Sequence, residues 1–186
     1  MKTLVVTIIA MFLAASISGQ EIKKDTLSRK QARQIKKQQR DAELKIQYDS
    51  ISQVIDSRQF VLEANFLSNN TGRRVFVLSN LNFIKIDTTY SVIQIGSNRG
   101  LGYNGVGGIT AEGRITGWKL EKNDKKKSIY ISMNVMTNIG IYDVFMDISA
   151  DGNAIATVSG LRAGRLQYDG KIVPLDESSI YTGHTP

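Results

Sequence analysis

The sequence predicts a mainly β protein: an antiparallel barrel or sandwich of short, hairpin-linked strands, preceded by an N-terminal helical arm. From residue 60 onward, apolar side chains alternate with polar ones, as in "FVLEANF". Turn residues separate successive runs of this kind, and several pairs can supply the positive φ angles of tight hairpins. Before residue 59, in contrast, a long segment without Pro or Gly is rich in Lys, Arg, Gln and Ala, which favour helix.

Residues 1–19 have the three-part pattern of a secretory signal peptide. A short charged start precedes an apolar run of 12 residues, Leu4 to Ala15, and small residues follow it. A membrane-spanning helix needs about 20 apolar residues. We therefore expect cleavage after Gly19, and no transmembrane segment in the mature chain. The chain has no Cys, so neither a disulfide nor a cysteine-linked lipid is expected. The expected location is periplasmic or extracellular.

Residues 20–58 form the basic helical arm. Its segment 23–45 holds nine Lys or Arg and three Asp or Glu, a net charge of +6 within a chain whose total is +7. This segment could contact an anionic surface, although a solvated tether has the same composition. Leu44, Tyr48, Ile51 and Ile55 recur at helical spacing and predict that the second half of the arm packs on the body. Nucleic acid is not an expected partner, because an exported protein rarely meets it.

Residues 59–186 form the expected antiparallel β domain. The strand-like runs are "FVLEANF", "VFVL", "NFIKI", "YSVIQI", "SIYISMNVM", "IYDVFMDIS", "AIATVS" and "RLQY". Expected turns between them are 70–72, 87–88, 123–124, 151–152 and 169–170. The pattern does not choose between barrel and sandwich. A hollow interior would favour a carrier of small ligands, and a filled one an interaction protein.

The stretch "SNRGLGYNGVGGITAEGRITGWKL", residues 97–120, contains the spacing G-x-G-x-x-G at Gly100, Gly102 and Gly105. In a dinucleotide-binding fold this motif opens a helix. Here β-branched residues and further glycines follow, so we expect no nucleotide and no other cofactor. Gly113 and Gly117 instead predict a strand face kept small, against which the Leu44–Ile55 helix would pack.

The candidate ligand-binding site is a polar cluster around this glycine-rich stretch. Arginine and tyrosine beside flexible glycine could grip a glycan or a peptide, although simple solvent exposure explains the same pattern. The residues are Arg99, Tyr103, Asn104, Glu112 and Arg114.

No catalytic residue can be named from the sequence. The only His is His184, near the C-terminus, and there is no Cys, so Ser-His-Asp, cysteine and zinc chemistry are not expected. Asp143 and Asp147 share a strand face, but four residues span about 13 Å, more than the roughly 5 to 9.5 Å that glycosidases use. No metal site is expected.

The stretches "SNRGLGYNGVGGITAEGRITGWKL", "YISMNVMTNIGIYDVFMDIS" and "SGLRAGRL" resemble an uncharacterised family of exported Bacteroidota proteins built on a domain of unknown function. The resemblance covers roughly residues 59–168 and implies a β domain in the cell envelope, with no activity to carry over. It also implies possible O-glycosylation, because such bacteria modify Asp-Ser/Thr followed by an aliphatic residue or Thr. Thr26 and Thr88 are the favoured positions, and Ser50 is expected to be too crowded.

The leading functional hypothesis is an exported, non-enzymatic, envelope-associated binding or interaction protein of unknown ligand. A different class, a carboxylate-dependent hydrolase acting on envelope glycans, is the alternative. A pair of carboxylates within about 10 Å in a cleft would favour that alternative.

Overall fold

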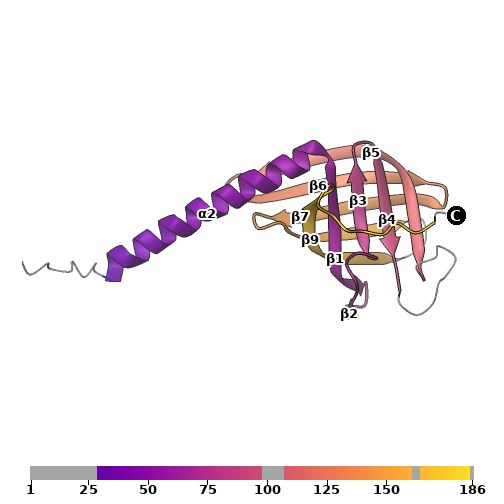
Figure 1. Ribbon diagram of the computed structural model, residues 1–186, viewed down its shortest axis with the longest axis horizontal. Coiled ribbons are helices and arrows are strands. Elements are labelled where there is room, and N and C mark those ends of the chain that lie inside the picture. Colours follow the sequence, from indigo (N-terminus) through magenta and orange to yellow (C-terminus); the bar gives the residue numbers. More distant parts are fainter. Residues whose placement is uncertain (1–28, 98–106, 161–163, 185–186) are drawn as a thin grey trace, which may run out of the picture. The chain divides into compact units, whose positions relative to one another are not determined.

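A computed structural model describes residues 29–97, 107–160 and 164–184 (Figure 1). The chain divides into two compact units, residues 1–37 and 38–186. Helix α2, Arg29–Ser57, begins in the first unit and ends in the second. The packing described below belongs to the second unit. The predicted signal peptide, Thr26, and the loop residues Arg99, Tyr103 and Asn104 lie outside the described residues.

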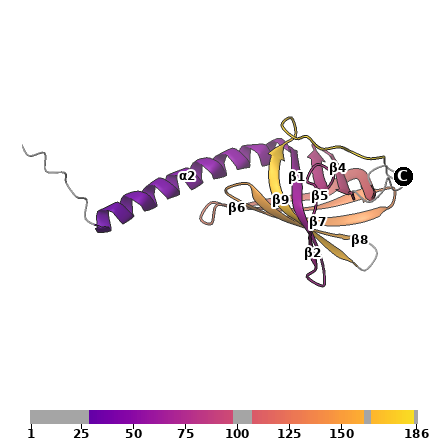
Figure 2. The same ribbon diagram turned by 60° about the horizontal axis from the view of Figure 1, so that its bottom comes forward.

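The strands of the described chain form one antiparallel sheet that closes on itself (Figures 1 and 2). In order around the wall, β1 pairs with β3, then β4 to β9 follow in sequence, and β9 pairs again with β1. The predicted antiparallel fold is confirmed. Of the two forms that the sequence allowed, barrel and sandwich, the structure is a barrel. The strands are β1 (Gln59–Asn69), β2 (Arg74–Phe76), β3 (Phe83–Asp87), β4 (Tyr90–Ile95), β5 (Ile109–Asn123), β6 (Ser128–Thr137), β7 (Gly140–Ser149), β8 (Asn153–Gly160) and β9 (Arg165–Pro174).

Strand β1 is the closing seam of the barrel. Its first half pairs with β3, its second half pairs with the short β2, and its other edge pairs with β9 along almost its whole length. A register shift between Ala64 and Phe66 kinks β1 against β9. Gly170 faces this kink, where an added Cβ would collide with the backbone of Glu63. The turn predicted at residues 169–170 is therefore wrong: both residues lie inside β9, and the glycine permits close backbone approach.

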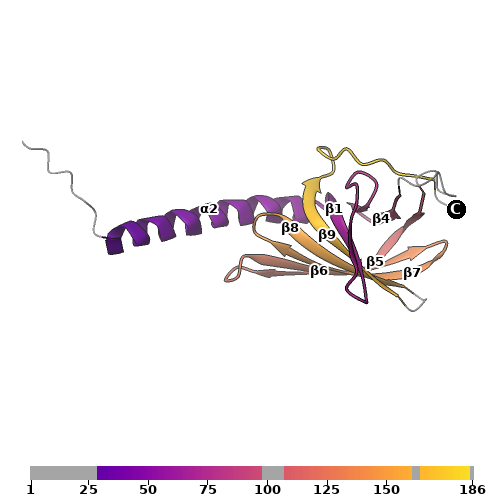
Figure 3. The ribbon, with the colours of Figure 1, turned by 90° about the horizontal axis from the view of Figure 1, so that it is seen from below.

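Alternation along the strands sends every second side chain into the barrel. In β7, for example, Val144, Met146 and Ile148 are buried while the residues between them are exposed. The adjacent strands β6, β7, β8 and β9 form one continuous wall (Figure 3). The inward residues of all the strands merge into one hydrophobic core.

The second half of α2 covers one end of the barrel. Tyr48, Ile51 and Ile55 belong to the barrel core, as their helical spacing predicts, and Ile55 is 0% exposed. Leu44, at the start of the predicted stripe, is 37% exposed, so the packed face begins one turn later than expected.

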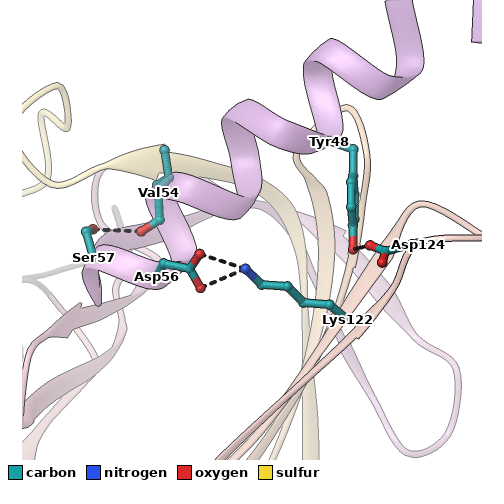
Figure 4. A network of polar contacts seen from close by, with 6 residues as sticks. All are labelled: Tyr48, Val54, Asp56, Ser57, Lys122 and Asp124. Atoms are coloured by element: carbon teal, nitrogen blue, oxygen red, sulfur yellow. Dashed lines mark hydrogen bonds and ion pairs between the residues drawn. The ribbon is translucent and has the colours of Figure 1, made fainter. Parts of the chain in front are cut away.

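Polar contacts tie this helix to the β5–β6 hairpin beneath it (Figure 4). The Tyr48 hydroxyl donates to Asp124 Oδ1 at 3.1 Å, and the Lys122 ammonium lies 2.7 Å from both carboxylate oxygens of Asp56. Lys127 places its ammonium 4.9 Å from the centre of the Tyr48 ring. The apolar residues supply the burial, and these contacts orient the helix across the barrel end.

The proposed role of Gly113 and Gly117 needs correction. A Cβ at Gly113 would collide with the backbone carbonyl of Met136 in β6, and one at Gly117 would stand 2.5 Å from Asn134 Oδ1. Gly117 also has a φ of +64° and sits where β5 slips in register against β6. Both glycines therefore permit close approach of β6, and their contacts do not involve α2.

Beyond β9, residues 175–184 cross the outer face of β1, β3 and β4 (Figures 1 and 2). Leu175 and Ile180 pack on a second, outer cluster of Val61, Phe83 and Val92. The Gln94 side chain anchors this segment. It donates to the carbonyls of Leu81 and Tyr181 and accepts from the Gly183 amide and the Thr110 hydroxyl, at 2.8 to 3.1 Å.

Candidate ligand-binding site

A cavity of about 530 Å³ lies at the barrel end opposite α2. The strand directions define this end: β4 and β8 finish here, whereas β5, β7 and β9 begin here. At the other end, the side chains of α2 fill the opening. The described residues that line it are Ile93, Ile95, Ile109, Ala111, Ile139, Gly140, Tyr142, Val158, Gly160, Gly164, Leu166 and Tyr168.

The floor of the cavity includes Tyr168, which is fully buried. Its hydroxyl donates to the backbone carbonyl oxygen of Gln94 at 3.3 Å. Burial, with a smaller contribution from Tyr142, raises the pKa of the Tyr168 phenol above its usual value. The phenol is therefore neutral at physiological pH, and the floor carries no charge.

Among the described residues that line the cavity, none is charged. Aliphatic side chains from β4, β5, β8 and β9 form most of the wall, and the two tyrosines supply the polar atoms. This composition and volume lie in the range of small-molecule sites, which are concave, mostly apolar and about 300 to 1,000 Å³. The described lining therefore offers apolar surface and two phenol groups.

Among the described residues, the barrel interior is packed at the α2 end and contains this cavity at the other. Phe60, Leu62, Ile84, Ile129 and Met146 are fully buried in the filled part. Towards the opposite end, small residues stand among the larger aliphatic ones, with Ala111 on β5, Gly160 on β8 and Gly164 just before β9. The described residues thus combine a packed core with a cavity, so neither sequence alternative, a filled or a hollow interior, describes the barrel alone.

This cavity was not predicted from the sequence. The signal was present, because Gly or Ala stands at inward positions of β5 and β8 and directly before β9, all at one end of the barrel. Predicting the cavity requires the pairing register, because only the order of strands around the barrel shows that these small residues face one space.

The structure describes two of the five candidate residues, Glu112 and Arg114. Both side chains are exposed on the outer face of β5. The Arg114 guanidinium carbon is 6.0 Å from the centre of the Tyr90 ring. Glu112 lines a shallow depression of about 440 Å³ with Lys85, Asp87 and Tyr90. Because Arg99, Tyr103 and Asn104 lie outside the described residues, the full cluster remains a prediction.

The residues considered for catalysis do not meet in the cavity. Asp143 and Asp147 point outward from β7, and Asp143 accepts a hydrogen bond from the Asn134 amide at 2.5 Å. His184 follows Gly183 in the outer C-terminal segment. Within the described parts of the chain, no three His, Cys, Asp or Glu residues are grouped so that they could hold a metal ion.

The two described glycosylation candidates are both accessible. Thr88 is exposed in the β3–β4 turn, as expected, with its backbone at a φ of 57°. Ser50 is exposed on α2, so the expectation that it is too crowded is wrong: the helix turns this position away from the barrel.

The sequence of the barrel, together with that of the helix end that covers it, matches a known family. Residues 42–172 match the family described as a domain of unknown function (DUF4251). The chain therefore belongs to the DUF4251 family, which confirms the resemblance. Among solved structures, it is similar to a DUF4251 family protein from Bacteroides eggerthii DSM 20697, with 27% identity and a TM-score of 0.60, over 72% of this chain and 91% of that one. No curated protein matches.

The family match begins at residue 42, inside α2, and so includes the part of the helix that packs on the barrel. Among the residues described, no helix has the combined length and apolar character of a membrane span.

Proposed function

We propose that this protein is an exported, non-enzymatic binding protein of the cell envelope that holds one small apolar molecule in the end of its barrel. The observation that carries the proposal is the cavity of about 530 Å³ with its uncharged, aliphatic lining. Export rests on the leader pattern of residues 1–19.

Two features support binding over a purely structural role. Two other depressions of similar volume each include charged residues, whereas the described lining of this cavity includes none. The described residues at the other end of the same barrel pack into the core. A concave, mostly apolar surface of this kind is typical of a ligand site.

The hydrolase alternative gains no support, because Asp143 and Asp147 lie on the outer wall and no carboxylate is among the described residues of the cavity. The basic segment 23–45 remains the proposed contact with an anionic surface. Its described residues, 29–45, are all exposed on α2, so their charges are available to a partner.

Titration with an apolar fluorescent probe, N-phenyl-1-naphthylamine, tests the proposal. We expect saturable binding of one probe per chain, with a rise in emission as the probe leaves water. The variant Ala111→Phe/Val158→Phe places two rings in the cavity and should weaken binding at least tenfold.

The matched control is Ile155→Phe, which adds a ring on the exposed outer face of β8. It should bind the probe as the unmodified protein does. Thermal unfolding of all three proteins checks that the cavity variant is folded. A folded cavity variant with unchanged affinity would exclude the cavity as the binding site.

A further inference from the structure

The cavity opens beside a group of exposed apolar side chains, which we call the apolar rim: Ile109, Met136, Ile139 and Ile141. Their exposed fractions run from 43% to 54%. Ile109 and Ile139 also line the cavity. The apolar surface therefore continues from the inside of the barrel to its outside without a charged residue among these four.

The β6–β7 hairpin presents most of this rim. Met136 and Ile141 are cross-strand partners on the outer face, and Ile139 lies in the two-residue turn that joins the strands. Hydrogen bonds from Ile139 N to Thr137 Oγ1, at 3.2 Å, and from Thr137 Oγ1 to the Gly140 carbonyl, at 2.8 Å, brace the turn. The hairpin thus holds three apolar side chains at its tip, where turns normally carry polar residues.

The charges described at this barrel end are mainly positive. Arg165 is the first residue of β9 and precedes Leu166 of the cavity wall. Arg73 lies in the β1–β2 connection. The last residue of β1, Asn69, pairs with Leu166, so this connection lies at the same barrel end. Both arginines are exposed, and neither forms an ion pair in the described residues. Of the carboxylates on neighbouring strands, Asp169 pairs with Arg74, whereas Asp143 accepts a hydrogen bond from the Asn134 amide and keeps its charge.

We propose that the apolar rim docks on the surface of a lipid bilayer that contains anionic headgroups, so that the apolar ligand passes between bilayer and cavity. Apolar side chains that project from a folded surface enter the boundary between headgroups and acyl chains, and nearby arginines bind lipid phosphates. Continuity between rim and cavity gives an apolar molecule a path that avoids water. This inference rests on the proposed function, because it names the source of the ligand.

The absence of Cys from the chain gives a local readout. A single cysteine at Met136, labelled with a nitrobenzoxadiazole maleimide, reports contact of the rim with lipid. The matched control carries the same label at Ile155, an exposed apolar residue on the outer wall, 44% exposed against 54% for Met136. A local label is needed because the basic segment of α2 could hold the protein on anionic vesicles by itself.

With vesicles of pure phosphatidylglycerol, the Met136→Cys label should shift its emission to the blue and gain at least twofold in intensity. The Ile155→Cys label should not change. Vesicles of pure phosphatidylcholine should give a smaller response at Met136→Cys, because they carry no net charge. No response at Met136→Cys, or equal responses at both labels, would overturn docking through the rim.

Failure of the two proposals can be told apart. If the unlabelled protein binds N-phenyl-1-naphthylamine in solution but the rim label does not respond, the ligand site stands and bilayer docking falls. If the rim label responds but the protein does not bind the probe, the rim is a membrane contact and the cavity is not the ligand site, so ligand transfer falls.

Discussion

The Tyr168 hydroxyl lies at the boundary between the packed core and the cavity. Its pKa is raised in the folded protein by burial, and burial together with the Asp124 contact also raises that of Tyr48. Below pH 10.0, the ordinary pKa of tyrosine, the folded and the unfolded chain both keep these protons, so the pKa shift does not change stability. Above it, the unfolded chain ionises first, so stability falls as pH rises.

We therefore predict that the free energy of unfolding falls above pH 10.0, by up to about 1.4 kcal/mol per pH unit for the Tyr168 phenol. Tyr168→Phe should cost about 0.5 to 1.5 kcal/mol at neutral pH, because the bond to the Gln94 carbonyl is lost. The free energy of unfolding of this variant should fall less steeply at alkaline pH than that of the unmodified protein. Urea unfolding at a series of pH values measures both effects, and parallel pH profiles for the two proteins would contradict this account of Tyr168.

Gly113 illustrates a glycine required by space alone. A Cβ there meets the β6 backbone, yet its φ is not in the left-handed region. Gly113→Ala should destabilise the protein by about 1 to 3 kcal/mol through forced separation of β5 and β6.

Gly72→Ala is the matched comparison, because Gly72 has a φ of +80° and open space around it. It should cost about 1 to 2 kcal/mol from backbone conformation alone. Chemical denaturation compares the two variants. If Gly113→Ala unfolds at the same denaturant concentration as the unmodified protein, β6 is not held as closely as described.

Helix α2 offers a test with one residue type in two environments. Ile55 is fully buried in the barrel end, whereas Ile46 is 70% exposed. Ile55→Ala should lower the free energy of unfolding by about 2 to 5 kcal/mol, and Ile46→Ala should change it by less than about 0.5 kcal/mol. Equal effects measured by thermal or denaturant unfolding would mean that the helix does not close the barrel.

At the scale of single elements, the sequence pattern predicted the features that depend on neighbouring residues in the chain. Strand β4 matches the run "YSVIQI" residue for residue, because alternation with β-branched residues is a property of the strand itself. The turn at 151–152 also formed. The turn predicted at Asp169-Gly170 was wrong because the same residue types suit both a hairpin turn and a close approach of two strands. Only the position of the partner strand decides between these two structures. The contacts of Gly113 and the cavity failed to emerge for the same reason: both depend on register between distant segments.

For the whole molecule, the leader predicts that residues 1–19 are removed during export. Protein recovered from its native cells should begin at Gln20 when sequenced from the N-terminus, because the apolar run is long enough for a signal peptide and too short for a span. Recovery of the chain with Met1 intact from the cytosol would contradict export.

The proposed function depends on an apolar ligand in the cavity at the end of the barrel. Native mass spectrometry of the protein purified from its own cell envelope, beside Ala111→Phe/Val158→Phe prepared in the same way, tests it most directly. We expect the unmodified protein to carry one small molecule per chain, released by organic solvent, and the variant to lack it. An unliganded unmodified protein, or the same bound mass in both, would contradict the claim.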